Sequence, residues 1–129
     1  MGGSQSSARS RYADNAVSTA SPARVLVMLY DRLVRDMVTA EEALGRRDLA
    51  RASGELLHAQ QIVLELDSSL EQDAWDGAAG LSALYAFLHR ELVQANVAKD
   101  AARVAGCREL VEPLRDAWRD AALLSATSP

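Results

Sequence analysis

The spacing of apolar residues in two segments of the chain constrains the fold most strongly. In residues 49–70 the apolar positions alternate steps of three and four: Leu49, Ala52, Leu56, Ala59, Val63, Leu66 and Leu70. Residues 104–121 repeat this spacing with Val104, Cys107, Val111, Leu114, Trp118 and Ala121. Such steps place the side chains on one face of an α-helix, and helices of this kind pack at shallow angles in antiparallel bundles.

Two further segments have helical periodicity. The first begins at Pro22, with Ser21 as its N-cap, and ends at Gly45, where a residue without Cβ can adopt the left-handed cap. The other spans residues 81–99. Asp48 can act as the N-cap of the helix over residues 49–70. The inner positions are Leu26, Leu29, Tyr30, Leu33, Met37, Ala40 and Leu44 in the first, and Leu81, Leu84, Leu88, Leu92 and Ala95 in the other. We therefore predict an all-α fold, an antiparallel up-down four-helix bundle with an extended N-terminal segment.

The length of 129 residues suits one domain. We expect a flexible N-terminal segment over residues 1–21, the helical bundle over residues 22–124 and a disordered tail over residues 125–129. Pro113 predicts a kink near Glu109 or two shorter helices, because an interior proline removes a backbone hydrogen bond at a cost of about 3 kcal/mol. The segment between residues 71 and 80, which contains Trp75, has no periodicity and is predicted to be a linker.

The charge and composition exclude several classes of function. The net charge is -4, the pI is near 5.1, and the basic residues are interleaved with acidic ones, which argues against nucleic-acid binding. No run of 18 apolar residues is present, and the N-terminal residues lack a secretory signal, so we expect a cytoplasmic protein. The single cysteine, Cys107, cannot form an internal disulfide.

Two enzymatic hypotheses receive little support. Glu55 and His58 match Glu-x-x-His, but a di-iron site needs this motif on two helices, and His89 follows Ala86 at the same spacing. A phosphotransfer histidine would need a nearby lysine to steady the phosphate, and neither histidine has one. We predict no enzymatic activity, no metal and no cofactor.

The chain has more apolar residues than one buried face per helix requires. Val27, Val34 and Val38 widen the stripe of the first helix, and Leu57 and Leu64 lie off the stripe of the second. One flank of the third helix carries Tyr85, His89, Asn96 and Asp100, with Leu92 at its inner edge and Val93 at its outer edge. This pattern favours partner binding. A central helix that touches two neighbours would also widen its apolar arc, and single exposed leucines are common.

The order of several short motifs resembles that of the flagellar export chaperones of the FliS type. The first is a tyrosine followed by Asn-x-Val-x-Thr-Ala-x-Pro, here Tyr12, Asn15, Val17, Thr19, Ala20 and Pro22, and after it comes Met28-Leu29-Tyr30-Asp31. The second helix carries Ala59, Ile62, Val63, Glu65, Leu66, Ser69 and Leu70 at the family's spacing. The third carries Leu84, Tyr85, Phe87, Leu88, Arg90, Leu92, Ala95, Asn96 and Asp100, and the last carries Leu114, Arg115, Asp116, Ala117 and Trp118.

This resemblance implies a cytosolic chaperone that binds the disordered C-terminal segment of flagellin, prevents its premature polymerisation and supports its type III export. Components of the export apparatus are possible further partners. It also implies that the N-terminal segment with Tyr12 covers the binding surface when flagellin is absent. From the apolar surplus and the family resemblance together, we expect the partner-binding residues to be Tyr12, Val27, Val34, Val38, Leu57, Ile62, Leu64, Tyr85, His89, Leu92, Asn96 and Asp100. The alternative function is a bundle whose apolar surplus forms a homodimer.

Overall fold

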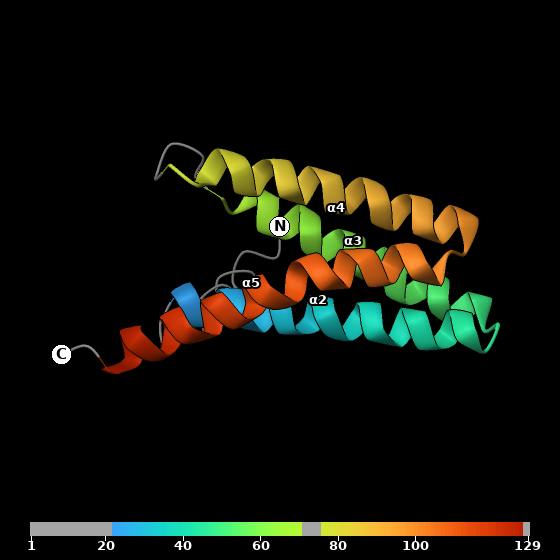
Figure 1. Ribbon diagram of the computed structural model, residues 1–129, viewed down its shortest axis with the longest axis horizontal. Helices are drawn as coiled ribbons and strands as arrows, with labels where there is room; N and C mark the ends of the chain where they lie inside the picture. Colours follow the sequence, from blue (N-terminus) through green and yellow to red (C-terminus); the bar gives the residue numbers. More distant parts are fainter. Residues whose placement is uncertain (1–21, 71–75, 128–129) are drawn as a thin grey trace, which may run out of the picture.

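The computed structural model describes residues 22–70 and 76–127, which form four α-helices and no strand (Figure 1). The helices are α2 (Pro22–Gly45), α3 (Leu49–Ser68), α4 (Ala78–Ala98) and α5 (Ala101–Thr127). Within the described part, α2 packs against α3 and α5, and α4 packs against the other sides of α3 and α5. The all-α bundle predicted from the sequence is therefore confirmed. The expected N-terminal segment, residues 1–21, lies outside the described residues.

The predicted inner stripes form the core. Its buried members include Tyr30, Leu33 and Met37 of α2, Leu56, Ala59, Val63 and Leu66 of α3, Leu88, Leu92 and Ala95 of α4, and Val104, Cys107 and Val111 of α5. One stripe position is different, because Leu49 is the first residue of α3 and its side chain is 44% exposed at the end of the bundle. Periodicity identifies a face of a helix, but it does not show where the neighbouring helices begin and end.

The turn between α2 and α3 uses an arginine where the sequence predicted a glycine. Arg47 has a φ of 62°, and the described glycines have no positive φ, so the prediction of a left-handed cap at Gly45 was wrong. The N–H of Asp48 donates to the carbonyl of Ala43 at 2.8 Å, and the N–H of Arg47 donates to that of Leu44 at 3.1 Å. These two bonds form a Schellman motif, which places its left-handed residue immediately before Asp48.

Asp48 begins α3 as predicted, since its carboxylate accepts a hydrogen bond from the N–H of Arg51 at 3.2 Å. The turn from α4 to α5 repeats the arrangement. Lys99 has a φ of 53°, the N–H of Asp100 donates to the carbonyl of Ala95 at 3.0 Å, and the Asp100 carboxylate accepts from the N–H of Arg103 at 3.2 Å. At each turn one aspartate both closes a helix and starts the next.

Helix α5 remains continuous through Pro113. Figure 1 shows that its C-terminal half runs in a different direction from its N-terminal half, as the predicted kink requires. The helix continues to Thr127, so its last residues extend into the stretch, 125–129, that was expected to be a disordered tail.

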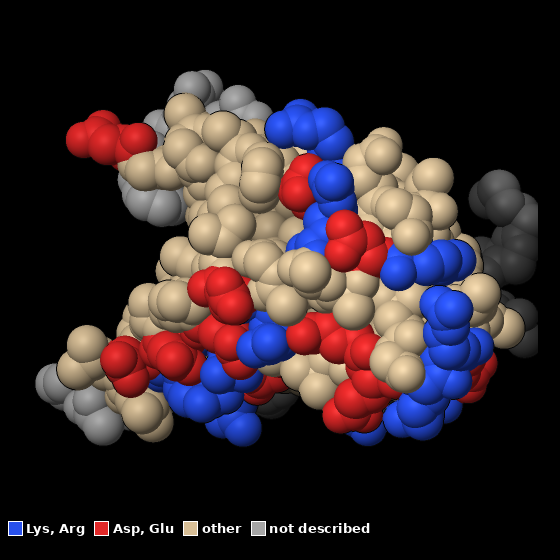
Figure 2. Space-filling view, turned by 45° about the vertical axis from the view of Figure 1, so that its right-hand side comes forward, with Lys and Arg blue, Asp and Glu red and all other residues tan. Residues whose placement is uncertain are grey.

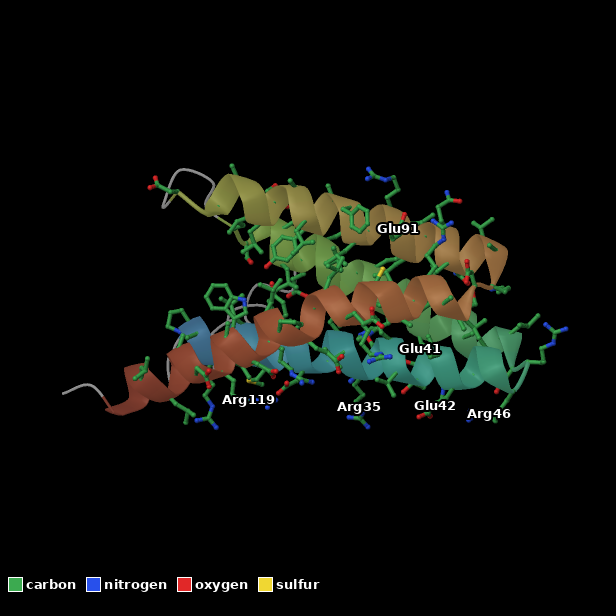
Figure 3. All side chains as sticks on the ribbon, viewed as in Figure 1. Arg35, Glu41, Glu42, Arg46, Glu91 and Arg119 are labelled. Carbon is green, nitrogen blue, oxygen red and sulfur yellow. The ribbon has the colours of Figure 1, made fainter. Side chains whose placement is uncertain are left out.

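Ion pairs join α5 to α2 along the helix pair with the most extensive packing. The guanidinium of Arg108 donates to both carboxylate oxygens of Glu41, at 2.6 and 3.1 Å, and to Glu112 at 3.0 Å. The hydrogen bond that Arg108 donates to Glu41 raises the pKa of the Arg108 guanidinium, which therefore stays charged. Nearer the end of α5, Arg119 donates to Asp31 at 3.0 Å. Figure 3 shows Glu41 between α2 and α5, whereas Arg35, Glu42 and Arg46 point away from the bundle.

Two adjacent leucines of α3 provide a test of this core. Leu56 is fully buried, whereas Leu57 is 51% exposed. We predict that Leu56→Ala lowers the free energy of unfolding by about 2–5 kcal/mol, because it leaves a cavity in the core. Leu57→Ala is the matched control and should change that free energy by no more than about 0.5 kcal/mol. Urea denaturation followed by circular dichroism measures both values, and equal effects would contradict the assigned orientation of α3.

Candidate partner-binding site

Two side-chain hydrogen bonds fix how α3 and α4 lie against each other. Ser82 of α4 donates to Asp67 of α3 at 2.9 Å, and Asn96 of α4 donates to Ser53 of α3 at 3.4 Å. Both bonds give the same antiparallel register of α4 along α3. By that register, Leu57 is level with Leu92, and Leu64 is level with Tyr85. The predicted leucines thus lie beside α4.

Leu57 and Leu64 are 51% and 52% exposed, which is unusual for two leucines that are two helical turns apart on one face. We refer to the outer surfaces of α3 and α4 around them as the α3–α4 face. On α4, Phe87 and Val97 are also exposed. The charged residues of α4 are Arg90 and Glu91, so this helix contributes little charge to the α3–α4 face.

The other side of the bundle has a different surface. Figure 2 shows acidic and basic atoms interleaved over α2 and α5, while the beginning of α4 is covered mainly by uncharged residues. Some charged groups of α2 and α5 pair across the two helices, as Arg108 does with Glu41 and Arg119 with Asp31. The α3–α4 face is therefore the better candidate for apolar contact with another protein.

The structure separates the predicted partner-binding residues by burial. Val38, Leu57 and Leu64 are exposed, and Val27, His89, Asn96 and Asp100 are partly buried. Tyr12 lies outside the described residues. The exposed and partly exposed positions can reach a partner without a change in the bundle, and their role in binding stays a prediction.

Four of the predicted partner-binding positions are buried in the bundle, so a partner cannot reach them without a change in the packing, and their role in binding stays a prediction. Val34 and Ile62 are 6% and 4% exposed, Tyr85 is 2% exposed and Leu92 is fully buried. For Val34 the reason is that α2 packs against both α3 and α5, which widens its buried arc. A helix between two neighbours buries more than one stripe, and this explains the apolar surplus of α2 without a partner.

Tyr85 points into the core because its hydroxyl pairs with that of Tyr30, with 2.7 Å between the oxygens. Burial raises the pKa of both tyrosines, so both hydroxyls are neutral at physiological pH. The ring of Trp118 lies 6.4 Å from that of Tyr30, and a side-chain hydrogen bond from Trp118 offsets part of the effect of burial on the pKa of Tyr30. The sequence identified these three residues as parts of motifs, but it gave no signal that they meet.

Asn96 and Asp100 have structural roles in addition to any contact with a partner. The Asn96 amide bonds Ser53 through its nitrogen and accepts a hydrogen bond from Lys99 at 2.6 Å through its oxygen. Asp100 caps α5, as described above. Both residues therefore hold the turn between α4 and α5 in place.

A buried ionic cluster was missed by the sequence analysis. Asp36 of α2 is 1% exposed, accepts a hydrogen bond from Arg32 at 2.9 Å, and is in close contact with His58 Nδ1 of α3. A signal existed, because Asp36 lies three residues after Leu33 and four before Ala40, at the edge of the buried stripe. His58 was considered only as part of Glu55-x-x-His58. In the structure Glu55 pairs with Arg51, and the described residues contain no cluster of three or more groups suited to bind a metal.

Comparison with known proteins identifies the family. The family model described as flagellar protein FliS matches residues 4–125 of the chain. The chain belongs to the FliS family. The flagellar secretion chaperone FliS of Bacillus subtilis strain 168 is 34% identical over 110 residues, which is 85% of this chain and 82% of that protein. The chaperone of the same name from Salmonella typhimurium is 31% identical over 109 residues, 82% of this chain and 80% of that protein.

A solved structure supports the fold of this FliS family member. The crystal structure of a bacterial flagellar chaperone superposes with a TM-score of 0.73 and 22% sequence identity, and covers 91% of this chain and 96% of the other. The resemblance that the motifs indicated is confirmed, and the FliS family consists of chaperones and not of enzymes. Within the described part of this FliS chain, no helix combines the length and apolarity that crossing a membrane requires.

The capping role of Asp100 can be separated from a role in binding. We predict that Asp100→Ala lowers the free energy of unfolding by about 1 kcal/mol, because the first turn of α5 loses its cap. Asp100→Asn should retain most of that stability, since asparagine caps helices about as well. Urea denaturation of the two variants measures the difference. Equal stability of the alanine and asparagine variants would show that the cap is unimportant.

The reactivity of Cys107 provides a further test of the core. Burial, with a smaller contribution from Glu91, raises the pKa of the Cys107 thiol to about 11. Because the raised pKa favours the neutral thiol, very little thiolate is present at pH 8, and the thiol is 2% exposed. We predict that a disulfide reagent labels the folded chain much more slowly than the urea-unfolded chain. Comparable rates at pH 8 would contradict the burial of this face of α5.

Proposed function

We propose that this FliS family member binds the C-terminal region of flagellin in the cytosol, prevents its premature polymerisation and supports its type III export. The observation that carries the proposal is the α3–α4 face, where Leu57 and Leu64 are half exposed on a surface with little charge. Its relatives are flagellar secretion chaperones, which agrees with a surface that protects an unfolded export substrate. A segment that becomes helical on binding would cover the two leucines with its own apolar side chains.

The energetics indicate how much surface the partner must cover. A fully buried leucine contributes about 1.5–3 kcal/mol, so covering Leu57 and Leu64, each already half buried, contributes roughly 2 kcal/mol in total. Ordering a disordered segment costs about 2–5 kcal/mol. The two leucines alone therefore cannot hold the partner. Further contacts are needed, and the accessible candidates among the described residues are Val27, Val38, His89 and Val93 beside the Asn96 and Asp100 flank.

The central experiment replaces the two exposed leucines by aspartate. We predict that the double variant Leu57→Asp, Leu64→Asp loses measurable binding to a peptide from the flagellin C-terminus, because two charges would be buried against its apolar face. The helical circular dichroism of the variant should be unchanged, since both positions are exposed. Titration calorimetry measures the affinity, and the gain of helix by the peptide reports its folding.

The matched control is Leu49→Asp. Leu49 is 44% exposed, but it is the first residue of α3 and lies beside the turn from α2, away from Leu57 and Leu64. This variant should bind as the unchanged chain does. If the double variant retains its affinity, the proposed surface is wrong. If the unchanged chain does not bind the peptide and is a stable dimer by analytical sedimentation, the alternative function applies, in which the apolar surplus forms a homodimer.

A further inference from the structure

Among the described residues one charged side chain is buried, and it contacts the surface through a histidine. Asp36 of α2 is 1% exposed, and its two carboxylate oxygens contact Arg32 and His58, whose side chains are 54% and 41% exposed. Arg32 lies one turn earlier on α2, and His58 belongs to α3. A buried ion pair is often no more stable than apolar side chains of similar size. Packing alone therefore does not explain a carboxylate at this position.

The contact with Asp36 fixes which ring nitrogen of His58 carries a hydrogen. A carboxylate oxygen only accepts hydrogen bonds, so Nδ1 of His58 carries the hydrogen and donates it. Arg32 already balances the charge of Asp36 through a hydrogen bond of 2.9 Å, so the cluster is neutral when the imidazole is uncharged. In that form Nε2 of His58 has no hydrogen and is a hydrogen-bond acceptor.

His58 lies at the margin of the α3–α4 face. It follows Leu57 directly along α3, and Gln61, one turn later, is also exposed. Glu55, one turn earlier, pairs with Arg51 at 3.2 Å, and Asp36 is the hydrogen-bond partner of His58 within the described part of the chain. Nε2 is therefore left for solvent or for a partner. A polar atom beside an apolar surface contributes mainly to the orientation and selection of what binds there.

We propose that Asp36 holds His58 in its Nδ1–H form, so that Nε2 accepts a hydrogen bond from a hydroxyl or amide side chain of the bound flagellin segment. This inference rests on the proposed function and extends it, because it adds a polar contact beside the two exposed leucines. Asp36 is a positioning residue, since it acts through His58. An acceptor at this position also selects against a carboxylate on the partner, because two acceptors without a hydrogen repel each other.

Two variants of the full-length chain separate the two ring nitrogens. In His58→Asn the amide N–H takes the place of Nδ1–H and still donates to Asp36, but the side chain ends short of Nε2. In His58→Gln the side-chain oxygen reaches the place of Nε2, and the donor to Asp36 is lost.

We expect His58→Asn to unfold at the same urea concentration as the unchanged chain. It should bind the flagellin C-terminal peptide about 3- to 10-fold more weakly, the usual effect of one lost hydrogen bond. His58→Gln should show the opposite behaviour. It should unfold at a lower urea concentration, because buried Asp36 loses a partner, and it should keep its affinity for the peptide.

A second measurement, ¹⁵N NMR of the imidazole, has a readout that stability alone does not change. The signals of His58 are those that disappear in His58→Asn. Nδ1 should resonate as a ring nitrogen with a hydrogen and Nε2 as one without, and the peptide should move the Nε2 signal upfield. If His58→Asn binds as tightly as the unchanged chain, if both variants lose affinity equally, or if Nε2 of the free chain carries the hydrogen, this inference is overturned and the proposed function stands. If the unchanged chain does not bind the peptide at all, both fail.

Discussion

The hydrogen bond between Tyr30 and Tyr85 spans the diagonal of the bundle, between two helices whose backbones are not direct neighbours. Each hydroxyl satisfies the other in an interior that offers few other partners. The pair fills the space between α2 and α4 where α5 turns away after Pro113, and Trp118 packs against it. The position of α4 relative to α2 depends on this contact.

The surface divides according to which helices carry charge. Helices α2 and α5 carry many charged residues, and ion pairs such as that of Arg108 with Glu41 join the two helices. Helix α4 carries few charges, and α3 contributes two half-exposed leucines beside it. A chaperone for an unfolded export substrate needs an apolar surface that does not cause aggregation of the chaperone itself. An apolar face limited to one pair of helices, opposite a charged one, is consistent with both requirements.

Much of the fold was predictable from the sequence, because the core stripes follow from spacing alone. The start of α2 at Pro22 and the cap at Asp48 were also predictable, since both depend on local chemistry. The partner-binding positions were harder to predict from the sequence. Spacing placed Val34 at the edge of its stripe, and whether an edge is buried depends on the number of neighbouring helices. The pairing of Asp36 with His58 depends on the register between α2 and α3, which no local pattern encodes.

The two aspartate turns have a consequence for how the molecule can change during evolution. Asp48 and Asp100 each complete one helix through the main chain and begin the next through the side chain. Both connections are short and their residues take part in the helix caps, so α2 and α3 form one helical hairpin, and α4 and α5 form another. Lengthening either connection would unlink its two helices at once. Variation in loop length should therefore be found in the connection between the hairpins, where Ser68 and Ala78 bound a longer stretch of chain.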